Sequence, residues 1–181
     1  MVKDKVVVYG LSTEGYSLAC LIATNGANVH IIDESSSSAI SLKAETAKTY
    51  PNVVSLQTGE PLLSMKPIKD AVAEADYIFF TPRIRKTGQD LKTEINSKFK
   101  DAVKSLKKHG SVIYCVPTGF TGNNENIALL RHVTGFEAGK ECSYFYFPLG
   151  NMDSTPQIIG SMDKTDDKKL LSLLTTGKEI K

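Results

Sequence analysis

Short apolar runs alternate along this chain with stretches in which apolar residues recur every three or four positions. The first pattern is typical of strands buried on both faces, and the second is typical of helices with one face on a core. We predict strands at residues 6–9, 29–32, 52–56, 77–80, 111–116, 144–147 and 157–159. Helices are predicted at residues 15–25, 40–48, 68–74, 95–106, 125–133 and 168–174.

The order of these elements predicts the fold class. Strands that alternate with helices almost throughout favour an α/β protein with a doubly wound, mainly parallel sheet and helices on both faces. The wholly apolar run at 6–9 predicts a strand inside the sheet rather than at its edge. A length of 181 residues fits a single domain over residues 1–181.

The first predicted strand leads into a dinucleotide-binding pattern. Gly10 follows the strand, and Leu11, Ser12 and Gly15 lead into the next helix. Asp33 closes the second strand 18 positions after Gly15. In such a βαβ unit the first glycine makes the turn and a later one lets helix and strand pack. The helix N-terminus receives the pyrophosphate, and the acid holds a ribose hydroxyl. We therefore predict a Rossmann-like domain, although Ser12 replaces the middle glycine of the usual three.

Three residues of this pattern can be interpreted in two ways. Ser12 either offers its hydroxyl to a phosphate or caps the helix. Glu14 lies in the first helical turn, where the helix dipole favours a carboxylate and where a phosphate would also bind. Its charge therefore either repels the phosphates of the dinucleotide or points into solvent. Asp33 disfavours a 2′-phosphate and predicts NAD rather than NADP, unless it is a plain turn residue beside Glu34.

Polar residues also follow two later strands, where the carboxyl ends of a parallel sheet form a crevice. Thr81 and Pro82 follow one strand and Thr118 follows the next, so all three are candidates for cofactor contact. The basic residues at 83–86 either bind a phosphate of a nucleotide sugar or form a solvated loop, and we favour the loop.

Composition excludes several function classes. The formal net charge is only +2, so neither a nucleic acid nor a membrane is expected as a partner. The three cysteines are far apart, which fits neither a zinc site nor a disulfide framework and favours the reducing cytoplasm. We interpret Cys115 as a small buried residue rather than a nucleophile. The histidines lack metal-ligand spacing, so no metal is expected.

Several segments resemble nucleotide-sugar dehydrogenases. They are residues 75–82 (ADYIFFTP), 87–91 (TGQDL), 116–119 (VPTG), 147–148 (FP) and 156–160 (PQIIG). Their order resembles the N-terminal NAD-binding domain of the UDP-glucose/GDP-mannose dehydrogenase family over essentially the whole chain. The resemblance implies NAD as cofactor and a nucleotide sugar as substrate, whose 6-hydroxyl the family oxidises to a carboxylate in two NAD-dependent steps.

The chain departs from the family pattern at residues that carry its chemistry. The family's catalytic cysteine lies in a later domain, and none of the three cysteines here matches it. The family's glutamate near the reacting carbon is replaced by Leu149, which cannot exchange a proton. We therefore expect NAD binding, weakened by Ser12 and Glu14, without a catalytic residue and without turnover by this chain alone.

Two other functions stay open. The chain could be a non-catalytic module that uses the fold for protein association with an altered pocket. It could also be one half of a split dehydrogenase, completed by a partner chain that carries the substrate domain. The expected partners are therefore a dinucleotide and a nucleotide sugar, with a homodimer or a partner chain as alternatives.

Overall fold

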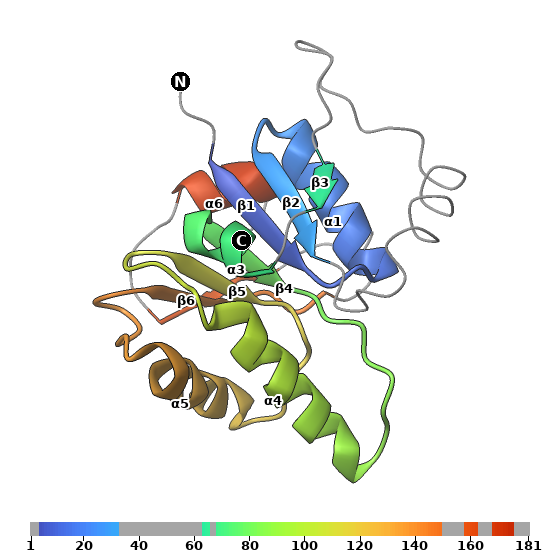
Figure 1. Ribbon diagram of the computed structural model, residues 1–181, viewed down its shortest axis with the longest axis vertical. Coiled ribbons are helices and arrows are strands. Elements are labelled where there is room, and N and C mark those ends of the chain that lie inside the picture. Colours follow the sequence, from blue (N-terminus) through green and yellow to red (C-terminus); the bar gives the residue numbers. More distant parts are fainter. Residues whose placement is uncertain (1–3, 33–62, 66–67, 150–157, 163–167, 176–181) are drawn as a thin grey trace.

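The computed structural model describes residues 4–32, 63–65, 68–149, 158–162 and 168–175 (Figure 1). The strands are β1 (Lys5–Tyr9), β2 (Asn28–Ile32), β3 (Leu63–Met65), β4 (Tyr77–Phe80), β5 (Ser111–Tyr114), β6 (Ser143–Tyr146) and β7 (Gly160–Ser161). The helices are α1 (Thr13–Thr24), α3 (Ile68–Glu74), α4 (Gln89–Val103), α5 (Gly122–Thr134) and α6 (Lys168–Leu174).

The strands form one seven-stranded sheet in the order β3-β2-β1-β4-β5-β6-β7. All neighbours pair in parallel except β6 and β7, which are antiparallel. β1 pairs with β2 on one side and with β4 on the other, so it lies inside the sheet as predicted. The chain adds strands in one direction from β1 and then in the other from β4, which makes the gap between these two carboxyl ends a topological switch point.

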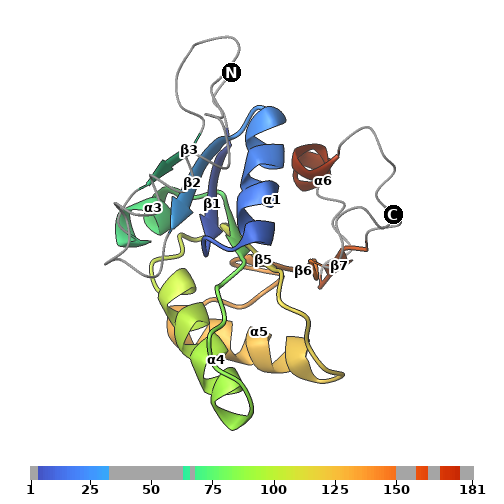
Figure 2. The same cartoon turned by 90° about the vertical axis from the view of Figure 1, so that its right-hand side faces the viewer.

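Helices cover both faces of the sheet, which confirms the predicted doubly wound architecture (Figure 2). Val6 and Val8 point to the face covered by α1 and α6, whereas Val7 and Tyr9 point to the face covered by α3, α4 and α5. Because successive side chains of a strand alternate between faces, a strand buried on both sides must be apolar at every position. That requirement explains the continuous apolar run that predicted β1.

Aromatic side chains fill the core beneath α4. The ring of Phe80 lies 5.0 Å from that of Phe99 and 5.2 Å from that of Tyr114, measured between centroids. Phe99 and Tyr114 meet edge to face, also at 5.2 Å. Each buried ring contributes roughly 1.5–3 kcal/mol through the apolar area it removes from water. This cluster therefore fixes α4 against β4 and β5.

The structure differs from the prediction in several elements. β3 was not predicted, because three residues are too few to show a period. The predicted helix at 40–48 and strand at 52–56 lie outside the described residues. The predicted strand at 157–159 is wrong at Ile158 and Ile159, since β7 comprises Gly160–Ser161 and Ile158 is exposed. α4 and α5 begin before their predicted ranges, and β5 ends two residues early, ahead of Pro117, which has no N–H to donate.

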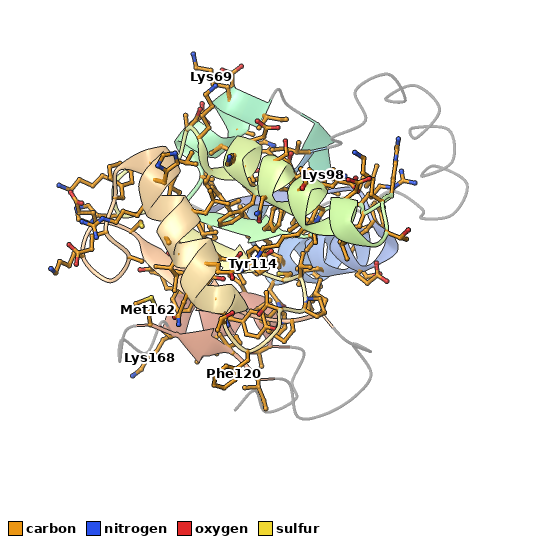
Figure 3. All side chains as sticks on the ribbon, turned by 90° about the horizontal axis from the view of Figure 1, so that it is seen from below. Lys69, Lys98, Tyr114, Phe120, Met162 and Lys168 are labelled. Carbon is orange, nitrogen blue, oxygen red and sulfur yellow. The ribbon has the colours of Figure 1, made fainter. Side chains whose placement is uncertain are left out.

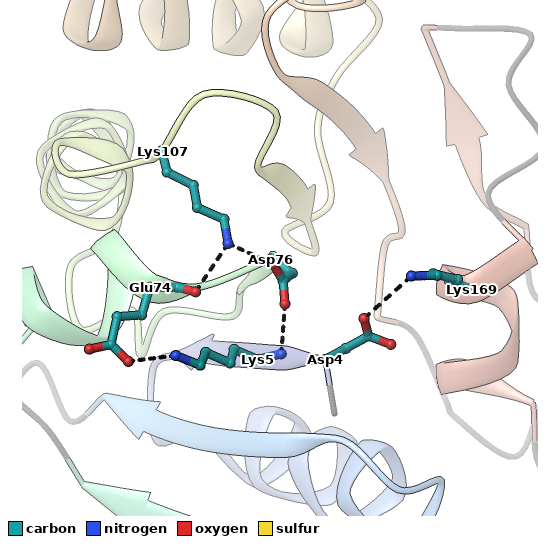
Figure 4. Close-up of polar contacts among 6 residues, drawn as sticks. All are labelled: Asp4, Lys5, Glu74, Asp76, Lys107 and Lys169. Atoms are coloured by element: carbon teal, nitrogen blue, oxygen red, sulfur yellow. Dashed lines mark hydrogen bonds and ion pairs between the residues drawn. The ribbon is translucent and has the colours of Figure 1, made fainter. Parts of the chain in front are cut away.

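Charged residues join the elements at the amino ends of β1 and β4 (Figure 4). Asp76 accepts hydrogen bonds from the backbone N–H of Lys5 at 2.9 Å and from Lys107 Nζ at 2.6 Å. Lys5 Nζ in turn pairs with Glu74 at 3.1 Å. Burial acts to raise the pKa of Asp76, but the bonds from Lys107 and Lys5 outweigh it and lower that pKa. The network braces the edge of the sheet opposite the carboxyl ends.

Candidate functional site

Gly10 makes the turn at the carboxyl end of β1, with φ at +113°. A Cβ at this position would lie 2.1 Å from the carbonyl oxygen of Thr81, which is far inside van der Waals contact. The backbone N–H of Gly10 donates to Ile32 at 3.0 Å and so continues the pairing with β2. Both the conformation and the contact therefore require glycine.

Ser12 caps α1. Its Oγ accepts a hydrogen bond from the backbone N–H of Gly15 at 3.0 Å and donates to the carbonyl of Thr81 at 3.4 Å. Of the two interpretations of Ser12, the structure shows the cap, which satisfies one of the free N–H groups at the start of the helix. The hydroxyl is thus directed to protein atoms on both sides.

Gly15 and Thr81 hold α1 against β4. A Cβ on Gly15 would lie 2.5 Å from Thr81 Oγ1 and 2.6 Å from the carbonyl oxygen of Gly10. Thr81 is only 5% exposed, and its hydroxyl lies 3.2 Å from the carbonyl of Tyr9 and 3.3 Å from that of Gly10. Gly10, Ser12, Gly15 and Thr81, all predicted as site residues, therefore form one packed unit.

A hollow of about 400 Å³ opens beside this unit, at the carboxyl ends of β4 and β5. We call it the crevice; its lining residues are Ser12, Glu14, Thr81, Pro82, Arg83, Ile84, Cys115, Val116, Pro117 and Leu149. Glu14 is exposed and lines this hollow. Leu11 is half-buried and packs against the core beside the crevice, and Asp33 lies outside the described residues.

One end of the crevice has no group suited to proton transfer. Cys115 is 3% exposed, and burial raises the pKa of its thiol well above the ordinary value. Its Sγ lies 3.6 Å from the carbonyl of Ile113, and its own carbonyl accepts from the N–H of Leu149 at 3.1 Å. A buried thiol stays protonated and is a poor nucleophile. The apolar side chains of Leu149 and Val116 complete this end.

A carboxylate holds the loop that forms another wall of the crevice. Glu94 accepts hydrogen bonds from the backbone N–H of Lys86 at 2.8 Å and of Arg85 at 3.2 Å. It also pairs with Lys98 Nζ at 2.9 Å, and Lys98 donates to the carbonyl of Arg83. The bonds from Lys98 and then Lys86 lower the pKa of Glu94 to about 2. Arg83, which sequence reasoning assigned to a solvated loop, is exposed and also lines the crevice.

Thr118 lies apart from the other predicted residues. It lines a second hollow of about 360 Å³, between α4 and α5, which shares only Pro117 with the crevice. Its backbone N–H donates to the hydroxyl of Tyr146 at 3.1 Å. The structure therefore brings Gly10, Ser12, Gly15, Thr81 and Pro82 together but places Thr118 on the other side of the loop after β5.

Comparisons with solved structures give the class of protein that this fold resembles. The chain superposes on an NDP-N-acetyl-D-galactosaminuronic acid dehydrogenase from Methanosarcina mazei Go1 with a TM-score of 0.74, at 18% identity and over 95% of its own length. GDP-mannose dehydrogenase from Pseudomonas aeruginosa matches with a TM-score of 0.71, at 22% identity over 94% of the chain. UDP-glucose dehydrogenase from Pyrobaculum islandicum matches with 0.73, at 17% identity over 99%. The fold thus resembles that of nucleotide-sugar dehydrogenases.

The chain spans less than half of these enzymes, covering 42%, 43% and 45% of their lengths. The same fold also matches a glycerol-3-phosphate dehydrogenase from Coxiella burnetii with a TM-score of 0.67, at 14% identity and over 51% of that enzyme. The architecture therefore does not specify a substrate. Neither a family model nor a curated protein matches the sequence.

The described part of the chain contains neither a cluster of metal ligands nor a membrane-spanning helix. Its histidines, cysteines and acidic residues form no cluster of three that could hold a metal ion. None of its helices has both the length and the apolar character needed to cross a membrane.

Proposed function

We propose that this chain binds an NAD-type dinucleotide in the crevice and does not by itself oxidise a nucleotide sugar. The observation that carries the proposal is the turn from β1 into α1. Two glycines there, Gly10 and Gly15, have their Cβ positions blocked by Thr81, so the N-terminus of α1 is held against the switch point of the sheet. A helix N-terminus in that place is the usual site for a pyrophosphate.

The proposal assigns a part of the site to each half of the cofactor. The backbone of Gly10 and Leu11 and the first turn of α1 would hold the pyrophosphate, with Pro82 beside it. The apolar end at Val116 and Leu149 would receive the nicotinamide half, which accepts a hydride when the cofactor is bound and a substrate is oxidised. Asp33 remains our candidate for the ribose, and it predicts tighter binding of NAD than of NADP.

One negative charge in the site would repel the pyrophosphate of the cofactor. Glu14 lines the crevice beside the N-terminus of α1, where a pyrophosphate would sit. Ser12, in place of a glycine, also adds a side chain between the backbone and the phosphate. We therefore expect weak binding, in which affinity is limited by repulsion rather than by shape.

Titration calorimetry with NAD and NADP tests the proposal. Glu14→Gln should tighten NAD binding roughly two- to fivefold, because a charge at a helix terminus is worth about 0.3–1 kcal/mol. Asp90→Asn is a matched control, because Asp90 is an exposed acid in the first turn of α4 and does not line the crevice. Absence of NAD binding in both the wild type and Glu14→Gln would contradict the proposal.

Turnover is tested by NADH absorbance with a panel of UDP- and GDP-sugars. We expect no NADH, because Leu149 cannot exchange a proton and the buried Cys115 cannot replace a catalytic thiol. Sustained NADH formation that is lost in Cys115→Ser would overturn this part of the proposal. The expected setting is the reducing cytoplasm, which fits the free thiols of Cys20, Cys115 and Cys142.

A second candidate function rests on the same charge. If Glu14 stands in for the bound anion, the chain is a non-catalytic module whose fold serves association. A further alternative is one half of a split dehydrogenase, completed by a partner chain that carries the substrate domain. NADH formation on addition of that partner chain would distinguish it from the non-catalytic module. Both alternatives use residues 1–181 as one domain, which we retain as a proposal.

A further inference from the structure

The second hollow, between α4 and α5, has the features of a separate binding site. Its volume is about 360 Å³, within the range of small-molecule sites. Figure 3 shows Tyr114 between the two helices and Phe120 projecting from the loop before α5. We propose that this hollow binds a planar, uncharged nitrogen heterocycle with an N–H donor, such as a nucleobase or its nucleoside. The proposal is independent of dinucleotide binding in the crevice.

A buried amide at the floor of the hollow has an acceptor to offer. Asn126 is 6% exposed, and its Nδ2 donates to the hydroxyl of Tyr144 at 3.3 Å. The hydroxyl of Tyr144 donates its own proton to Asn123 Oδ1 at 2.9 Å, so this hydroxyl must be the acceptor in its hydrogen bond with Asn126. Within the described part of the chain, Asn126 Oδ1 accepts no hydrogen bond. Because Asn126 lines the hollow, the N–H of a ligand bound there can donate to this oxygen.

Tyr114 adds a donor beside this acceptor. Its side chain lines the same hollow. Burial raises the pKa of its phenol to about 12, although a hydrogen bond with Asn126 acts to lower that pKa. The phenol therefore keeps its proton at neutral pH and can donate it. The floor thus presents one donor and one acceptor next to each other, which matches a heterocycle edge with a ring nitrogen beside an amino group.

The walls of the hollow are apolar and suit a flat ring. Leu91 and Ile95 of α4 form one wall, and Pro117 forms part of the other. Phe120 lines the mouth and is fully exposed, so its ring is free to stack on a base. Stacking on an aromatic side chain stabilises bases of every kind. An aliphatic or phenyl side chain of a protein partner would fill the walls but leave the floor without hydrogen bonds.

Charges at the mouth favour a ligand without a phosphate. Lys92 Nζ pairs with Glu125 at 2.6 Å, so the cation is already neutralised. Glu125 also lies in the first turn of α5 and lines the hollow, where it offsets the positive helix end. A nucleoside should therefore bind more tightly than its monophosphate.

Cytidine is the probe, because its N3 and N4 amino group form the required edge and it is not part of the dinucleotide proposed for the crevice. Titration into the full chain, followed by amide NMR, should show saturable binding with shifts at Leu91, Ile95 and Asn126. N4,N4-dimethylcytidine lacks the donor and should bind at least about tenfold more weakly. Cytidine monophosphate should also bind more weakly than cytidine.

Phe120→Ala should weaken cytidine binding at least about threefold without changing Tm, because the ring is fully exposed. Ile84→Ala is the matched control, since Ile84 is an exposed apolar residue that lines the crevice instead, and it should leave cytidine binding unchanged. The proposal is overturned if millimolar cytidine does not bind, if dimethylation has no effect, or if the shifts are confined to Gly10 and Gly15.

Discussion

Replacing Gly15 by alanine tests how tightly the turn at the switch point is packed. The new Cβ would lie 2.5 Å from Thr81 Oγ1 and 2.6 Å from the backbone oxygen of Gly10. To restore an ordinary carbon–oxygen separation of about 3.4 Å, the start of α1 must move away by roughly 1 Å. Neither obstructing atom can give way easily, since one is backbone and the other belongs to a buried side chain that braces the turn.

The size of the effect follows from two opposing terms. Overpacking a well-packed site costs about 1–3 kcal/mol. Alanine recovers up to about 1 kcal/mol over glycine within a helix, and less in the first turn. We therefore expect Gly15→Ala to lower the free energy of unfolding by roughly 1–2 kcal/mol. For a chain of this size, that corresponds to a fall in Tm of roughly 2–8 °C.

Urea denaturation followed by circular dichroism measures this change. Ser17→Ala is the matched control, because Ser17 is exposed on the same helix and gains helix propensity without a clash. In a Thr81→Ala background the loss caused by Gly15→Ala should shrink but persist, since only one of the two obstructing atoms is removed. If Gly15→Ala is as stable as the wild type, the packing argument at this turn is wrong.

Three further predictions concern stability and reactivity. Ser12→Ala should lower the free energy of unfolding by about 1 kcal/mol and Ser12→Gly by only a few tenths, as measured by urea denaturation. Glu94→Gln should destabilise by roughly 1 kcal/mol at neutral pH. Because the folded pKa of Glu94 is lowered from 4.5 to about 2, this difference should disappear as pH falls through that window. Iodoacetamide labelling followed by mass spectrometry should modify the half-buried Cys20 before the buried Cys115.

Elements with a strong internal pattern could be predicted from the sequence. β1 was predicted within one residue and β4 at both ends, because strands covered on both faces must be apolar throughout. α6 was also predicted at both ends. β3 and β7 have three and two residues and owe their pairing to neighbouring strands, so no local pattern marks them.

The candidate site was predictable only in part, for a geometric reason. Strand ends locate residues along the edge of a sheet, and this was sufficient for Gly10 and Thr81. The position of a strand end does not show to which side of the sheet edge the following loop turns. Pro117 lies between the two hollows and lines both, and Thr118 after it lines only the second. The polar floor at Asn126 was also beyond sequence reasoning, because a single asparagine in a helix gives no sign of its burial.

Under the proposed function, Glu14 and Leu149 lie within one crevice but are expected to act on different quantities. Glu14 lies beside the helix N-terminus, so its charge affects how strongly an anion binds there. Leu149 lines the same crevice, and its backbone N–H donates to the carbonyl of Cys115. In the proposed function its aliphatic side chain bears on proton transfer, because it has no proton to exchange. Removing the Glu14 charge should therefore change affinity without creating activity. We do not expect Leu149→Glu to produce NADH either, because the thiol of Cys115, to whose carbonyl Leu149 is hydrogen-bonded, is buried and protonated and cannot form a covalent intermediate.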